Sequence, residues 1–104
     1  PALAASQWLG SPPDYPTGVD VVVAWVTERR DALVAGEVNA VVVNFNFPTC
    51  PTGTPRGQVV EVPVAAGIEG RDLGVVDCEG DPPELSDDFD ALLWGFTSET
   101  ELTF

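Results

Sequence analysis

The sequence predicts an α/β fold, and three of its segments lead to that prediction. Residues 1–6 form a short apolar run that ends in a hydroxyl, as expected for a buried strand of an α/β sheet. Residues 17–36 place apolar side chains at helical spacing, and residues 38–47 alternate apolar and polar side chains as a strand does. A strand, a helix and a second strand in this order are typical of an α/β architecture.

The predicted helix begins at Thr17, whose hydroxyl can cap the first turn, with Asp20 as the acidic partner three residues later. Gly36 stands where the helix would end. The valines of this segment also permit a strand, but its length favours a helix. The apolar stripe of the predicted helix consists of Val19, Val22, Val23 and Val26, and is widened by Trp25, Leu33 and Val34.

Two strand-like segments follow the helix and predict a β-hairpin. The first ends at Pro48, and a loop rich in Pro, Thr and Gly covers residues 49–57. The second covers residues 58–64, where Pro63 indicates either the edge of a sheet or the end of the strand.

The remainder of the chain is predicted to form an arm, a helix and a last strand. Residues 65–86 are acidic and rich in Gly, with only residues 73–78 resembling a short strand. Ser86 or Asp87 can cap a short helix that ends at Gly95, and residues 96–104 alternate as a strand with one buried face. We therefore expect a sheet core over residues 1–64, an arm or loop over 65–86, and a helix with a closing strand over 87–104.

The composition excludes several classes of partner. The chain has 104 residues, with 17 Asp and Glu against 4 Arg, and a formal charge of −13. Such a charge opposes binding to nucleic acid polymers and to anionic membranes. Hydrophobic residues make up 44% of the chain, which favours a packed core over an acidic disordered tail. No apolar run approaches the roughly 20 residues that cross a bilayer, so we expect a soluble chain, either cytoplasmic or exported.

The chemistry open to the chain is narrow. Without His, it cannot form a Ser-His-Asp triad, and two cysteines are too few for a closed zinc site with four ligands. We predict no catalytic residue within the chain. Cys50 and Cys78 either form a disulfide in an oxidising compartment or remain reduced thiols in the cytoplasm, and the sequence leaves both states open.

A few polar residues are candidates for binding. Ser6 would lie at the carboxyl end of a parallel strand, where open α/β sheets hold ligands, unless it caps the next turn. Asn44 and Asn46 occupy the polar side of a strand and would contact either a strand-end hydrogen-bond network or a substrate. Asp87 and Asp88 are adjacent carboxylates of the kind that divalent cations prefer, although capping of the last helix is the favoured explanation.

Four blocks of sequence, in order, resemble the SurE-type survival-protein nucleotidases. Residues 1–7 (PALAASQ) are similar to the family's strand GIPALAVSQ, and residues 44–48 (NFNFP) to its strand end LNVNFP. Residues 56–64 resemble the segment that follows in the family, and residues 88–102 its closing pattern TDF-x-A-x-x-x-G-Y-x-S-V-T-P-L. The chain departs from this pattern at Glu99 and Glu101, where the family usually has Val and Pro, and at Trp94 in a usually polar stretch.

The resemblance implies a phosphomonoesterase of 5′- and 3′-nucleoside monophosphates that uses Mg²⁺ or Mn²⁺, with an α/β core and a C-terminal arm that assembles dimers. The family's metal ligands are a consecutive Asp pair, a Ser and an Asn, and all precede the segment that matches Pro1, so none is carried over to this chain. We therefore expect the C-terminal portion of such an enzyme, inactive alone, which associates with itself or with a missing N-terminal half. The alternative is a stand-alone, non-catalytic oligomerisation or binding module derived from that family.

Overall fold

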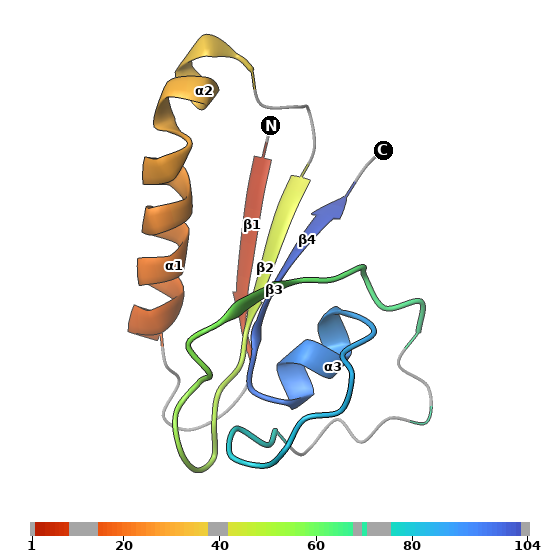
Figure 1. Cartoon of the computed structure of the whole chain (residues 1–104). Coiled ribbons are helices and arrows are strands. Elements are labelled where there is room, and N and C mark those ends of the chain that lie inside the picture. The colour runs from red at the N-terminus through yellow and green to blue at the C-terminus, as the bar shows by residue number, and fades with distance from the viewer. Residues whose placement is uncertain (1, 9–14, 38–41, 68–69, 71–75, 103–104) are drawn as a thin grey trace.

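In the described part of the chain, four strands form one open sheet in the order β1-β2-β4-β3, and helices lie on both of its faces (Figure 1). The computed structural model describes residues 2–8, 15–37, 42–67, 70 and 76–102. β1 runs parallel to β2, whereas β4 is antiparallel to β2 and parallel to β3. This mixed architecture confirms the predicted α/β class. The elements are β1 (Ala2–Gln7), α1 (Tyr15–Glu28), α2 (Arg30–Ala35), β2 (Val42–Phe47), β3 (Val59–Glu61), α3 (Asp88–Leu93) and β4 (Thr97–Leu102).

The predicted hairpin is wrong, because β4 inserts between β2 and β3. Side chains on both faces of β4 are buried, among them Thr97, Ser98 and Thr100, and such a strand needs neighbours on both sides. β3 spans three residues and is soon followed by Pro63, which suits an edge position. The alternating pattern of the last strand was visible in the sequence, but its place in the sheet was not.

The predicted helix is present with different limits. α1 begins at Tyr15, two residues before Thr17, because Pro16 in the first helical turn removes an N–H that would have no partner within the helix. The helix is interrupted at Arg29, whose φ is −108° and ψ 6°, so that α2 forms a separate turn. Gly36 ends α2 with a φ of 72°, as predicted.

α1 packs on the sheet through a face different from the one predicted. The buried cluster beneath α1 consists of Val43, Phe45 and Phe47 of β2. Gly18 lies so close that a Cβ atom there would stand 3.0 Å from the ring of Phe47. The partly buried side chains packed against this core are Leu3, Val21, Val22 and Trp25. Of the predicted stripe, Val22 and the flanking Trp25 pack against this core, while Val19, Val23 and Val26 are exposed.

The segment predicted to be an arm is partly packed against the rest of the domain. Residues 71–75 lie outside the described part of the chain, so the strand predicted over 73–78 is visible only at residues 76–78, which are not a strand. There Val76 and Cys78 are buried, and the N–H of Asp77 donates to the carbonyl of Leu93 at 2.8 Å.

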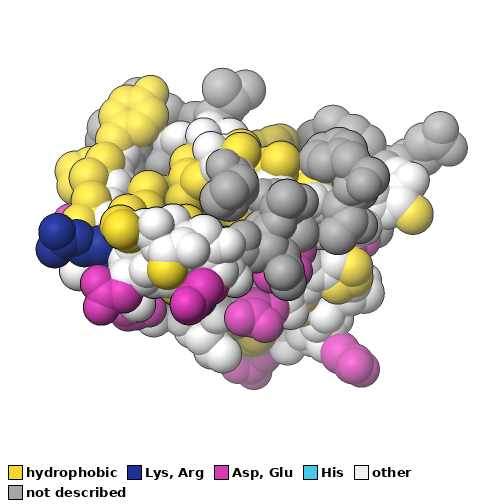
Figure 2. Space-filling model, turned by 90° about the horizontal axis from the view of Figure 1, so that it is seen from above, with side chains coloured by type: hydrophobic (Ala, Val, Ile, Leu, Met, Phe, Trp, Pro, Cys, Tyr) yellow, Lys and Arg dark blue, Asp and Glu magenta, His cyan; other side chains and the backbone are white. Residues whose placement is uncertain are grey.

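Charge is unevenly distributed over the surface. Figure 2 shows acidic side chains along one side of the molecule as seen from above, while apolar side chains gather on the opposite side next to basic ones. Arg29 also contacts an aromatic side chain, because its guanidinium carbon lies 4.4 Å from the centre of the Trp25 ring. Within the described residues, no helix combines the length and apolar character required to cross a membrane.

Candidate functional site

A pocket of about 350 Å³ opens where the parallel strands β1 and β2 end, next to the first turns of α3. We call it the β1–α3 pocket. Ligands of open α/β sheets bind at the carboxyl ends of parallel strands, so its position is that of a binding site. The pocket is lined by Ser6, Gln7, Trp8, Asn46, Asp88, Phe89 and Leu92.

Three of the residues singled out in the sequence meet in this pocket through hydrogen bonds. Ser6 and Asn46 are register partners on neighbouring strands, and the Ser6 hydroxyl donates to Asn46 Oδ1 at 2.9 Å. Asn46 Nδ2 in turn donates to Asp88 Oδ2 at 3.2 Å. The second oxygen of Asp88 accepts from the N–H of Ala65 at 2.8 Å. A continuous polar chain therefore runs from the end of β1 through β2 to the start of α3.

Asn44 and Ser98 lie on the same face of the sheet as Asn46, but they do not line the pocket. Asn44 stands opposite Ala4 and Thr100, one step further from the strand ends than Asn46. Ser98 is the register partner of Asn46 on β4, and its buried hydroxyl has no hydrogen-bond partner among the described residues.

Asp87 has a structural function at the start of α3. Its carboxylate accepts from the N–H of Asp90 at 2.9 Å, which is the geometry of an N-cap, and the residue is buried. The N–H of Asp88 donates to the carbonyl of Pro63 at 2.9 Å, which ties the helix start to the segment after β3. These contacts place Asp88 and Phe89 beside the pocket.

The acidic pair does not fit a metal centre. Asp87 caps the helix, whereas Asp88 accepts hydrogen bonds from Asn46 and Ala65. Mg²⁺ and Mn²⁺ favour several oxygen ligands around one point. Among the residues described, no three His, Cys, Asp or Glu side chains gather in a group that could hold a metal ion. We therefore derive no chemical step through a metal held by this pair.

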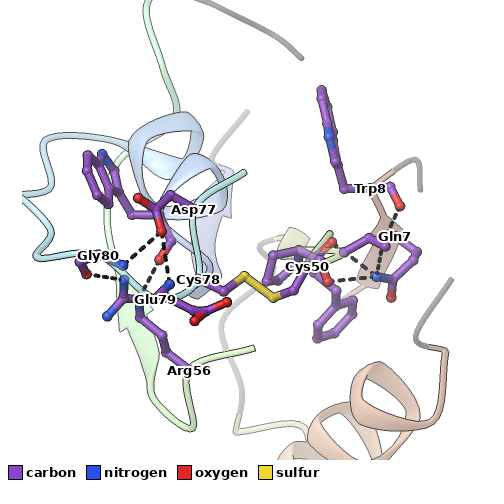
Figure 3. Close-up of a disulfide and its surroundings, with 12 residues drawn as sticks. Gln7, Trp8, Cys50, Arg56, Asp77, Cys78, Glu79 and Gly80 are labelled. Atoms are coloured by element: carbon purple, nitrogen blue, oxygen red, sulfur yellow. Dashed lines mark hydrogen bonds between the residues drawn. A yellow bond between two sulfur atoms is a disulfide. The ribbon is translucent and has the colours of Figure 1, made fainter. Parts of the chain in front are cut away.

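Sequence analysis missed the residues that form the apolar wall of the pocket and those that fix it. Gln7 Nε2 donates to the carbonyl of Pro48 and to Thr49 Oγ1, both at 2.9 Å. Thr49 Oγ1 donates to the carbonyl of Trp8 at 2.6 Å, which fixes the exit of β1. Figure 3 shows the Trp8 side chain pointing away from this network. A large aromatic residue directly after a strand end was the signal available in the sequence.

Cys50 and Cys78 form a disulfide beside this network (Figure 3). The bond joins the loop after β2 to the segment before α3, across a separation of 28 residues. Arg56 adds to this connection, because its Nε donates to the carbonyl of Trp94 at 2.6 Å and its Nη2 to that of Gly80 at 2.5 Å. Of the two states that the sequence left open, the structure contains the oxidised one.

One carboxyl group beside the disulfide has a shifted pKa. Asp77 Oδ1 accepts from the N–H groups of Gly80 and Glu79, at 2.8 and 2.9 Å. These two hydrogen bonds lower the pKa of Asp77 below its ordinary value, and the bond from Gly80 has the larger effect. The nearby positive charge of Arg56 lowers the pKa further. The carboxylate closes the turn that follows Cys78.

Comparisons of the chain with known protein families, with curated proteins and with solved structures gave no match.

Proposed function

We propose that this chain is the C-terminal portion of a SurE-type, metal-dependent nucleoside-monophosphate phosphatase. The observation that supports this best is the position of Ser6 and Asn46, which the family-like blocks supply and which meet at the carboxyl ends of two parallel strands. β1 lies within the first of the blocks that resemble the family, and β2 overlaps the second. The chain would supply one wall of the substrate pocket.

The catalytic metal of such an enzyme would have to come with ligands from outside the described residues. Asp87 caps α3, and no group of three metal-binding side chains surrounds Asp88 among the described residues, so we expect the chain alone to release no phosphate from nucleotides. The outer side of β1 offers a place for the missing part, because β1 is an end strand of the sheet and Ala4, Ala5 and Ser6 are exposed. Parallel strands are normally covered, and a further strand could pair along this edge.

The test is to isolate the natural protein from its source, measure its intact mass and assay phosphate release from 5′-AMP with Mn²⁺. We expect a mass well above 11.0 kDa, peptides preceding Pro1 that contain an adjacent Asp pair, and metal-dependent release of phosphate. Asn46→Ala should lower kcat/KM about tenfold, because the hydrogen bonds that join Asn46 to Ser6 and Asp88 in the wall of the pocket are lost. Gln58→Ala, an exposed amide outside the pocket, is the matched control. A mass of 11.0 kDa without phosphate release would contradict the proposal.

A non-catalytic association module is the second candidate, and the outer face of α1 favours it. Tyr15, Val19, Val23 and Val26 follow one another at helical spacing and are all exposed, Val19 at 58%. An exposed apolar stripe of this kind is typical of an interaction surface. Sedimentation of the chain should then reveal an oligomer that Val19→Lys with Val23→Lys dissociates, whereas Val34→Lys on α2 leaves it intact. A sharp monomer at high concentration would exclude self-association.

A further inference from the structure

The β1–α3 pocket has an aromatic wall. The rings of Trp8 and Phe89 meet edge to face, with their centres 6.1 Å apart and their planes at 76°. Leu92 adds an aliphatic side chain from the next turn of α3. A third ring can join an edge-to-face pair by offset stacking, which contributes beyond the burial of its surface. The volume of about 350 Å³ lies at the small end of ligand sites, which run from about 300 to 1,000 Å³, and suits a single or fused ring.

The polar wall of the pocket is rich in acceptors. The Ser6 hydroxyl uses its proton on Asn46, so its oxygen is left with acceptor capacity. Asp88 accepts from Asn46 and Ala65, but a carboxylate has lone pairs for about two hydrogen bonds more. Asn46 donates one N–H of its amide to Asp88 and retains a second. A ligand that complements the oxygens of Ser6 and Asp88 carries N–H or O–H donors, and the second N–H of Asn46 can meet an acceptor of the ligand.

Charge limits the ligand further. Asp88 places a carboxylate in the pocket, and the whole chain carries a formal charge of −13. A phosphate or carboxylate group bound here would be repelled by both. The pocket is therefore unsuited to the anionic end of any ligand.

We propose that the β1–α3 pocket binds an uncharged aromatic heterocycle with an amino group, stacked on the Trp8–Phe89 pair and donating to Asp88 and Ser6. The adenine ring of a nucleoside meets these requirements, and its choice as the probe rests on the proposed function. In a nucleoside monophosphate the phosphate would then point out of this pocket, away from Asp88.

The test is a titration of the isotopically labelled whole chain with adenosine, followed by nuclear magnetic resonance. We expect saturable shifts of the Trp8 indole and the Asn46 side-chain amide, and contacts between adenine protons and the rings of Trp8 and Phe89. Purine riboside, which lacks the amino group, should bind about tenfold more weakly, as the loss of a hydrogen bond to a charged acceptor predicts. Inorganic phosphate should leave both resonances unchanged.

A matched pair of variants separates the pocket from the general surface. Trp8→Leu should weaken adenosine binding about tenfold, whereas Trp94→Leu, a half-buried Trp outside the pocket, should not. If Trp8→Leu does not fold, the contacts measured on the wild-type chain decide. The proposal is overturned if adenosine gives no saturable shift at Trp8 and Asn46, if purine riboside binds equally well, or if phosphate moves the same resonances.

The two proposals can fail separately. Binding of adenosine by a natural protein that releases no phosphate from 5′-AMP leaves the ring site standing and removes the phosphatase. Release of phosphate without any adenosine contact to Trp8 or Phe89 does the reverse.

Discussion

The two sides of the sheet, to either side of β2, differ in how well they are covered by other elements. On the carboxyl-terminal side, β4 buries Thr97, Ser98 and Thr100, and it lies among α3, β3 and the disulfide. On the amino-terminal side, β1 exposes Ala4, Ala5 and Ser6, and α1 exposes a stripe of valines. The first side has the burial of a complete domain, whereas the second presents an edge and a helix face that remain available to another chain or segment.

The two sides also differ in what holds them. α1 is attached mainly by apolar packing on β2, supplemented by a hydrogen bond of 3.2 Å from Trp25 Nε1 to Glu99. The carboxyl-terminal side is held by directed links, which include the disulfide, the two bonds of Arg56 to carbonyl groups and the cap of Asp87. Directed links fix loops that have little apolar surface to bury, whereas a long helix can be held by its buried face alone.

The largest expected effect comes from breaking the disulfide. Removal of the link by Cys50→Ala with Cys78→Ala should lower the free energy of unfolding by about 3 kcal/mol, because it releases a loop of 28 residues in the unfolded chain. Urea denaturation measures the loss. A reducing agent should lower the wild type to the level of the double variant and leave that variant unchanged. An equal response of both proteins to reductant would contradict this account.

Substitution of two valines compares the buried core of β2 with the exposed face of α1. Val43→Ala in the core should lower the free energy of unfolding by about 2 kcal/mol, because it leaves a cavity beside Phe45 and Phe47. Val23→Ala on α1 should change it by less than about 0.5 kcal/mol, since the side chain is 57% exposed, against 3% for Val43. Urea denaturation of the two variants tests this. A large loss in Val23→Ala would mean that a partner covers α1 in solution.

Local patterns predicted most of the elements, but not how they are placed. The strand periodicity predicted over residues 38–47, the turn at Gly36 and the helix cap at Ser86 or Asp87 depend on neighbours in sequence. The described part of that strand is β2, Gly36 ends α2, and Asp87 is the residue that caps α3. The hairpin prediction failed because strand order depends on which strand is buried on both faces, a property that β4 shows only in context. The face of α1 was misjudged for a similar reason: Gly18 allows the closest approach, and helical spacing alone favoured the valines.

The candidate site could be predicted in part. Ser6 was identified from its position at the carboxyl end of a predicted strand, Asn46 from its place on the polar side of a strand, and Asp88 from its acidic pair. Their mutual hydrogen bonds could not be predicted, because they depend on the register of β1 with β2 and on the position of α3 over the sheet. Gln7, Trp8 and Phe89 were missed because a single polar or aromatic residue near the end of a strand or helix is only a weak signal of a pocket.

Removing the N-cap of Asp87 tests a weaker interaction on the carboxyl-terminal side of the sheet. Asp87→Ala should lower the free energy of unfolding by about 1 kcal/mol, because the N–H of Asp90 loses its acceptor at a buried helix start. Asp87→Asn keeps a side-chain oxygen in the same place and is the matched control, with a smaller expected loss. Thermal denaturation distinguishes them. Equal losses in the two variants would show that charge or packing, and not the cap, is what matters at this position.

The smallest effect is the pH dependence of Asp77, in the turn behind the disulfide. Its pKa in the folded chain lies below the ordinary value of 3.8, because the N–H groups of Gly80 and Glu79 stabilise the carboxylate. The stability it contributes is therefore complete above the unfolded-state pKa and is lost as the pH falls through the lower, folded-state value. The difference in urea midpoint between wild type and Asp77→Asn should be constant above about pH 5 and shift against the wild type below about pH 4. A titration of the Asp77 carboxyl carbon with a midpoint at or above 3.8 would show that these hydrogen bonds do not hold the charge.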